Sequence, residues 1–139
     1  MIKKFIYICL SLILVACSAS LKPNGSNTIV AGDYVAISGD IFYHIKITLP
    51  EQVKIVIRLE EHAIADVSAA IIATKTIYTN GKQVPISFNM MVPKVSLDAA
   101  ISPGFTVLLY HQNRLIFINK SNMPYKENVR QLIKVDQVY

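Results

Sequence analysis

The feature that most constrains the fold is an alternation of apolar and polar residues between positions 37 and 59. Side chains on a strand point alternately to opposite faces, so this period predicts strands with one buried face. The first run ends at Pro50, and a tight turn at 50–52 would pair it with the second run as a hairpin. Gly39 interrupts the first run and suggests a bulge or bend. The residues expected to face the core are Ile37, Ile41, Tyr43, Ile45, Ile47, Leu49, Val53, Ile55, Ile57 and Leu59.

The remaining sequence also reads as short strands separated by turns. Residues 61–70 are ambiguous, because their alanines could start a helix, and we expect a loop there. Further strands are expected where β-branched and aromatic residues recur, at 71–78, 84–90, 105–109, 115–118 and 129–135. About seven strands with no convincing long helix predict an all-β fold, a small antiparallel β-sandwich over residues 34–139.

Turn-forming and strand-breaking residues define the limits of these strands. Asn80–Gly81 and Gln112–Asn113 are typical of tight turns between strands. Pro85 and Pro93 flank the run at 84–90, and proline cannot donate a ladder hydrogen bond, which favours an edge strand. We expect no internal repeat.

The N-terminus is typical of a lipoprotein signal peptide. A basic start precedes an apolar run from Phe5 to Ala16, too short for the about 20 residues of a spanning helix. The run ends in Leu-Val-Ala-Cys, which resembles a bacterial lipobox and predicts lipid attachment at Cys17. An ordinary signal peptide with a chance cysteine, or an uncleaved anchor, is the alternative. We expect residues 1–16 to be the signal peptide and residues 17–33 a lipidated, flexible tether rich in Pro, Gly, Asn and Ser.

This N-terminus also predicts where the protein is found and which chemistry it lacks. By resemblance to known lipoproteins, Ser18 after the cysteine implies the periplasmic face of the outer membrane of a Gram-negative bacterium, with the lipid at Cys17 as the membrane contact. Cys9 leaves with the signal peptide and Cys17 carries lipid. No free thiol is then expected, so a disulfide, a cysteine nucleophile and a cysteine-ligated metal are not predicted.

The residues that could carry catalysis or bind metal are scattered. His44, His62 and His111 have no metal-site spacing and are interpreted as surface or edge histidines. Glu60 and Glu61 are adjacent and would face opposite ways on a strand. One interpretation has Glu60 and Asp66 converging in a loop as a carboxylate pair, but a structural turn with Asp66 accepting backbone hydrogen bonds is favoured. The sequence therefore predicts no enzyme, no metal and no cofactor.

The charge and the exposed apolar residues favour a binding surface. The net charge of +5, from 14 basic and 9 acidic residues, is spread along the chain and predicts no nucleic-acid partner. Scattered lysines protect edge strands or face anionic lipid and polysaccharide. Met90 and Met91 could line a peptide groove, although Met90 in the core and Met91 exposed is the simpler interpretation. The candidate binding residues along this edge are Val84, Pro85, Ser87, Met91 and Pro93.

Three segments resemble the YbaY family of lipoproteins: residues 39–50 (GDIFYHIKITLP), 59–66 (LEEHAIAD) and 83–88 (QVPISF). The similarity extends from about Ala36 to Val138. That family is grouped with the YscW-type pilotins of type III secretion, which escort secretin subunits to the outer membrane. The resemblance implies a β-sandwich with a chaperone-like role and transfers no catalytic residue.

The sequence departs from the family pattern at two places. Residues 123–125 (MPY) stand where the family more often has Tyr before Pro, and His44 replaces a common arginine.

Two functions remain open at this point. The leading hypothesis is a non-enzymatic, outer-membrane-anchored periplasmic lipoprotein that binds or assembles an envelope protein by docking a segment on a strand edge or apolar groove. The alternative is an envelope polysaccharide- or peptidoglycan-associated protein that binds or processes glycan, with Tyr34, Tyr78 and Tyr125 as candidate contacts. Exposed tyrosines beside carboxylates in a cleft would favour glycan, and an exposed apolar strip would favour protein.

Overall fold

The computed structural model describes residues 32–63 and 68–139. The expected signal peptide, Cys17, Asp66 and the tether up to residue 31 lie outside the described residues. The only helix in the described part is α1 (Lys94–Asp98). The strands are β1 (Tyr34–Phe42), β2 (Val53–Glu61), β3 (Ala70–Tyr78), β4 (Ile86–Pro93), β5 (Pro103–His111), β6 (Arg114–Ile118), β7 (Met123–Pro124), β8 (Gln131–Lys134) and β9 (Asp136–Gln137). The predicted all-β class is confirmed.

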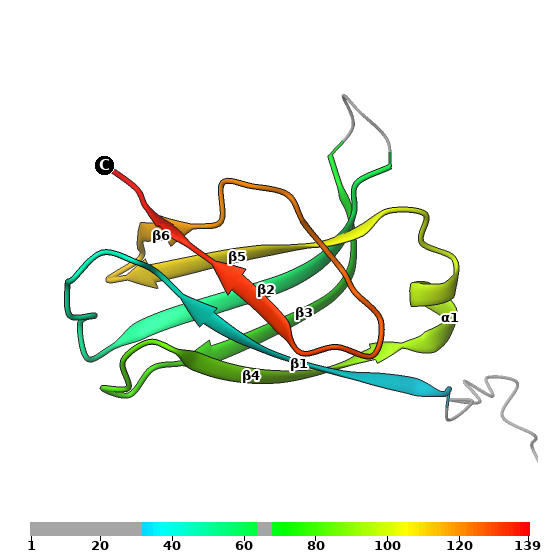
Figure 1. The fold of residues 1–139 in the computed structure, drawn as a ribbon, viewed down its shortest axis with the longest axis horizontal. Helices are drawn as coiled ribbons and strands as arrows, with labels where there is room; N and C mark the ends of the chain where they lie inside the picture. The colour runs from blue at the N-terminus through cyan, green and yellow to red at the C-terminus, as the bar shows by residue number, and fades with distance from the viewer. Residues whose placement is uncertain (1–31, 64–67) are drawn as a thin grey trace, which may run out of the picture.

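The strands form two sheets, as the sandwich prediction required. The smaller sheet has the order β4-β1-β8, and the larger has the order β3-β2-β5-β6-β9, with β7 paired to β5. Figure 1 shows the strands of the smaller sheet crossing those of the larger one. All pairs are antiparallel except β1 with β8, which is parallel. A parallel pair needs a long connection, and the chain from β1 to β8 provides one.

The core lies between the sheets and is filled by the inward-facing residues that the alternation identifies. On β2 these are Val53, Ile55, Ile57 and Leu59, all fully buried. They meet buried side chains from the other strands and loops, including Ile37, Ile41, Phe88, Met90, Val92, Phe105, Val107, Leu109, Phe117, Ile133 and Val135. Met90 is buried and Met91 exposed, which confirms the simpler interpretation of that pair.

The first predicted strand is too long. β1 ends at Phe42, and residues 43–52 form a loop in which Ile45 and Ile47 are 43% and 45% exposed. Their placement in the core was therefore wrong. The loop is held by side chains instead of a ladder: the Gln83 amide pairs with the N–H and C=O of Leu49 at 2.8 and 3.1 Å. Tyr43 is buried as expected, stacked on Phe117 with ring centroids 4.8 Å apart.

The predicted hairpin between the first two strands does not form. β1 pairs with β4 and β8, whereas β2 pairs with β3 and β5, so the two runs lie in different sheets. Each run has one apolar face, and placing them in opposite sheets buries both faces against each other. The intervening loop is long enough to cross between the sheets.

Gly39 produces no bulge. The β1–β4 register runs without a shift from Tyr34 opposite Pro93 to Ile41 opposite Ile86. A Cβ at Gly39 would lie 2.5 Å from the Phe88 ring and 2.6 Å from the Gln131 carbonyl oxygen. Glycine is required here because β1 approaches both groups too closely for any side chain.

The predicted turns and edge strand are confirmed. Asn80 and Gly81 form a turn with positive φ values of 47° and 81°, and Gln112 and Asn113 join β5 to β6 with φ values of 48° and 63°. β4 forms a ladder only with β1 and is the edge of the smaller sheet. The last predicted strand is shorter than expected, since β8 begins at Gln131.

Candidate functional site

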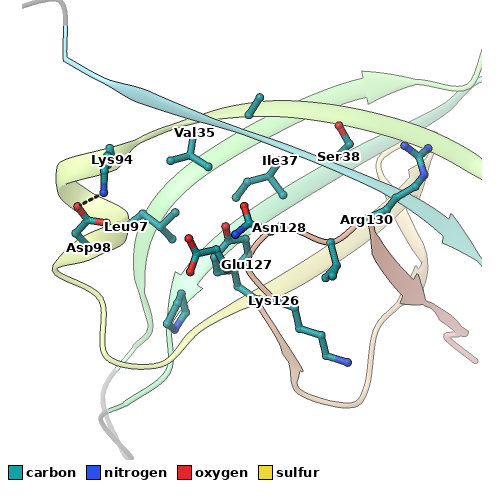
Figure 2. Close-up of a pocket in the computed structure, with 14 residues that line it drawn as sticks. Val35, Ile37, Ser38, Lys94, Leu97, Asp98, Lys126, Glu127, Asn128 and Arg130 are labelled. Atoms are coloured by element: carbon teal, nitrogen blue, oxygen red, sulfur yellow. Dashed lines mark hydrogen bonds and ion pairs between the residues drawn. The ribbon is translucent and has the colours of Figure 1, made fainter.

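A hollow of the described part of the chain lies beside the first half of β1. β8 pairs only with Gly39–Phe42, so, among the described residues, positions 34–38 have a ladder partner, β4, on one edge and none on the other. A cleft of about 550 Å³ opens along this free edge, between β1, α1 and the segment 125–130. Figure 2 shows the side chains that line it. The site therefore exists because β8 is short.

The floor of the cleft is apolar. Val35 and Ile37 are on the inward face of β1, where Ile37 is buried and Val35 packs against the core. Leu97 from α1 and Tyr125 also pack against the core while lining the cleft. The cleft is thus a place where the hydrophobic core reaches the surface without being covered by a strand.

The rim of the cleft is charged. Lys94 and Asp98 lie one helical turn apart on α1, and the Lys94 ammonium donates to the Asp98 carboxylate at 2.6 Å (Figure 2). This hydrogen bond, together with the charge attraction, raises the pKa of Lys94. On the facing side, burial first and the Glu127 charge second raise the pKa of Tyr125. An exposed ion pair such as Lys94–Asp98 adds little to the stability of the fold. Its main effect is to give the apolar floor a polar border.

An ion-pair cluster holds the segment 125–130 against the smaller sheet. The Arg130 guanidinium donates to both oxygens of Asp40 on β1, with Nη2 2.6 Å from Oδ1, and Nη2 also donates to the Ser87 hydroxyl at 3.1 Å. Ser87 in turn donates to Asp40 Oδ1 at 2.6 Å. The hydrogen bonds from Arg130, then that from Ser87, lower the pKa of Asp40 from 3.8 to about 2. The cluster joins β1, β4 and the residue before β8.

Gln131 shapes the same segment from inside. Its buried side chain donates to the carbonyl oxygens of Lys126 and Val129 at 2.6 and 2.8 Å and accepts from the Lys126 N–H at 3.3 Å. Asn128, with a φ of 56°, makes the turn that these bonds close. The wall of the cleft is therefore set by local hydrogen bonds.

Of the binding residues predicted from sequence, Ser87, Met91 and Pro93 lie on β4, the ladder partner of β1, and Val84 and Pro85 lie directly before it, because β4 begins at Ile86 and not at residue 84. Met91 is exposed on the outer face, as is Ser87, whose hydroxyl is engaged by Asp40. Val84 packs against the core and is joined to Pro85 by a cis peptide bond. Pro93 lies directly before α1 and lines a second, smaller hollow.

The two glutamates considered for catalysis have structural partners. Glu60 is buried, accepts a 2.6 Å hydrogen bond from the Thr106 hydroxyl and lies 3.8 Å from Arg58. Glu61 accepts from the N–H groups of Ala63, Ile101 and Ser102. Partial burial raises the pKa of Glu61, but the backbone hydrogen bonds outweigh it and the net shift is downward.

Each of the three histidines has different neighbours. His44 meets the Phe42 ring edge-on at 5.4 Å, and His111 Nδ1 lies 3.1 Å from the Gln52 carbonyl oxygen. His62 Nε2 is buried next to Gly104 and has no hydrogen-bond partner among the residues that the structure describes. Within residues 32–63 and 68–139, no three His, Cys, Asp or Glu side chains gather closely enough to hold a metal ion. No helix in the same ranges is long and apolar enough to cross a membrane.

Sequence reasoning missed the cleft itself. Tyr125 was noted as a candidate contact, but the role of Leu97, Arg130 and Gln131 was not. The spacing of Lys94 and Asp98 is one signal that could have identified α1, since side chains four residues apart meet on a helix. The Arg130–Asp40 pair joins residues 90 positions apart and leaves no local pattern.

One comparison with known proteins shows the family of this chain, and a second shows a shared fold. The family described as "Type III secretion system lipoprotein chaperone (YscW)" matches residues 33–135. A solved structure of an alternative pilotin from the type II secretion system of Vibrio cholerae is 23% identical, with a TM-score of 0.68 over 77% of this chain and 99% of that one, which shows a shared fold. No curated protein matches. The narrower resemblance to YbaY stays a prediction, and this chain belongs to the YscW family of type III secretion system lipoprotein chaperones.

Proposed function

We propose that this chain is a non-enzymatic, pilotin-like lipoprotein chaperone that binds a short segment of an envelope protein in the cleft beside β1. The observation that carries the proposal is the free edge of residues 34–38 above an apolar floor. Membership of a family of secretion lipoprotein chaperones and the fold shared with a pilotin support it. The partner would be a component of a secretion system.

The chemistry of the cleft suits a peptide segment. Its volume of about 550 Å³ is in the range of ligand sites, roughly 300–1,000 Å³. Apolar side chains of the partner would enter between Val35, Ile37 and Leu97, while the unpaired main-chain groups of β1 are available for hydrogen bonds. The paired charges of Lys94 and Asp98 form the border.

The same proposal places the protein in the envelope. Lipid attachment at Cys17 would anchor it to the outer membrane, with the described domain on the periplasmic side. A stable anchor needs more than one acyl chain, which a lipoprotein cysteine supplies.

Site-specific photo-crosslinking in intact envelopes tests the site. A photoreactive residue replaces Leu97 in the cleft, Met91 on the β4 edge, or Leu132, which is exposed on the outer face of β8. We expect an adduct with an outer-membrane secretion component from position 97 and none from position 132. An adduct from position 91 alone would move the site to the edge predicted from sequence, and the same adducts from all three positions would refute a specific site.

Glycan binding is the second candidate function. It is favoured by Tyr125, which lines the cleft with the carboxylates Asp98 and Glu127. Against it, Tyr34 and Tyr78 are exposed elsewhere, and the ring of Tyr125 already packs edge-on against Phe105. Co-sedimentation with isolated peptidoglycan that is lost in Tyr125→Ala would support glycan binding, and turnover lost in Glu127→Gln would overturn the non-enzymatic proposal.

A further inference from the structure

Four large apolar side chains are exposed at one end of the molecule. Tyr34 and Met91 are 56% and 57% exposed, Val95 is 76% exposed and Ile101 is 86% exposed. They come from β1, β4, α1 and the loop before β5, and these segments reach the side of the domain that carries α1 in Figure 1. Single exposed apolar residues are ordinary, but a gathering at one end is a mark of a contact surface.

The β1–β4 ladder and the smaller hollow place Tyr34, Met91 and Val95 close together. In the β1–β4 ladder Tyr34 pairs with Pro93 and Ala36 with Met91, so the side chains of Tyr34 and Met91 share the outer face of the sheet. Tyr34, Pro93 and Val95 line one shallow hollow. Ile101 follows α1 after a short turn and is fixed by the bond from its N–H to Glu61. We name Tyr34, Met91, Val95 and Ile101 the apolar end.

The chain enters the domain at this same end. Gly32 and Asp33 directly precede β1, so the segment that leads back to Cys17 joins here. Residues 18–31 can span at most roughly 50 Å when fully extended. A lipid at Cys17 would therefore hold the bilayer within this distance of the apolar end.

The charges that line the smaller hollow, Asp33, Lys94 and Asp98, do not favour an electrostatic mode of contact. Lys94 is paired with Asp98 at 2.6 Å, and Asp33 adds a further negative charge. Without a basic excess, anionic headgroups gain nothing here. Contact with lipid would come from the insertion of apolar side chains into the interface.

We infer that the apolar end is a lipid-contacting surface, which docks on the bilayer that carries the anchor and inserts Val95 and Ile101. This inference rests on the lipidation of Cys17 in the proposed function. Because α1 supplies Val95 to the apolar end and Leu97 to the cleft, docking places the mouth of the cleft next to the membrane. A partner segment would then be received at the bilayer surface.

Tryptophan reporters test this docking, since the chain has no tryptophan of its own. The full-length lipidated protein is reconstituted into zwitterionic phosphatidylcholine vesicles that contain a nitroxide-labelled phospholipid. Ile101→Trp and Val95→Trp report on the apolar end. The matched control is Ile45→Trp, in the half-exposed loop 43–52 at the opposite end of the domain (Figure 1). Melting temperatures check that each variant is folded.

We expect blue-shifted emission and quenching at positions 101 and 95, no quenching at position 45, and the same result in high salt. Flotation of the vesicles reports the anchor separately. Protein that floats with no quenching at 101 and 95, or with equal quenching at all three positions, overturns the docking while leaving the anchor intact. Protein that does not float overturns the lipidation and the docking together.

Discussion

Asp40 accepts hydrogen bonds from Arg130 and Ser87, and these three residues link three parts of the chain. Their contribution is electrostatic in origin and therefore depends on pH. A carboxylate whose pKa is lower in the folded protein than in the unfolded chain stabilises the fold above the unfolded pKa, and this contribution is lost as pH falls.

The first prediction applies this linkage to Asp40. With a folded pKa of about 2 against an ordinary value of 3.8, the stabilisation should disappear between about pH 4 and pH 2. Asp40→Asn removes the titrating group, so the fall in stability over this window should be shallower than in the wild type. Urea midpoints measured at several pH values check it, and parallel curves for the two proteins would contradict the assignment.

At the scale of elements, β2 lies in the centre of the larger sheet and the loop 43–52 lies outside both sheets. Both segments carry isoleucines at odd positions, and the sequence pattern treats them alike. Burial separates them: Ile55 is fully buried, whereas Ile47 is 45% exposed.

The second prediction compares truncation at these two positions. Ile55→Ala should lower the free energy of unfolding by about 2–5 kcal/mol, because it opens a cavity in the core. Ile47→Ala removes the same atoms from a half-exposed site and should cost about 0.5 kcal/mol, as surface substitutions usually do. Chemical denaturation of both variants checks this difference, and equal losses would restore the longer strand expected from the alternation.

At the scale of the whole molecule, the start of β1 lies next to the proposed anchor segment, the apolar end and the cleft. The anchor is proposed at Cys17, the apolar end includes Tyr34, and the cleft begins at Val35. In the proposed function, β1 would connect membrane attachment to partner binding.

The third prediction concerns the anchor. Cys17→Ser removes the sulfur that would carry the lipid, so the protein should no longer be processed as a lipoprotein and should leave the outer-membrane fraction. Fractionation after a salt wash, with metabolic labelling by palmitate, checks this outcome. A variant that stays in the outer-membrane fraction without label would show that another feature attaches it.

Much of the local structure could be predicted from sequence because it depends on neighbours along the chain. The alternation on β2 correctly identified Val53, Ile55, Ile57 and Leu59 as core residues, since a strand's side chains alternate whatever it pairs with. The turn at Asn80–Gly81 also followed from local preference, because these residues accept positive φ.

Only the tertiary structure decided which strands pair and where the site lies. The alternation is identical whether a segment joins a ladder or, like residues 43–49, is held by side chains such as Gln83. β1 pairs with β4 and β8 and not with β2, because this packing buries the apolar faces of β1 and β2 against each other. The cleft arose because β8 stops short and Arg130 reaches Asp40 across 90 residues. Such contacts join residues distant in sequence, so their geometry exists only once the sheets have packed.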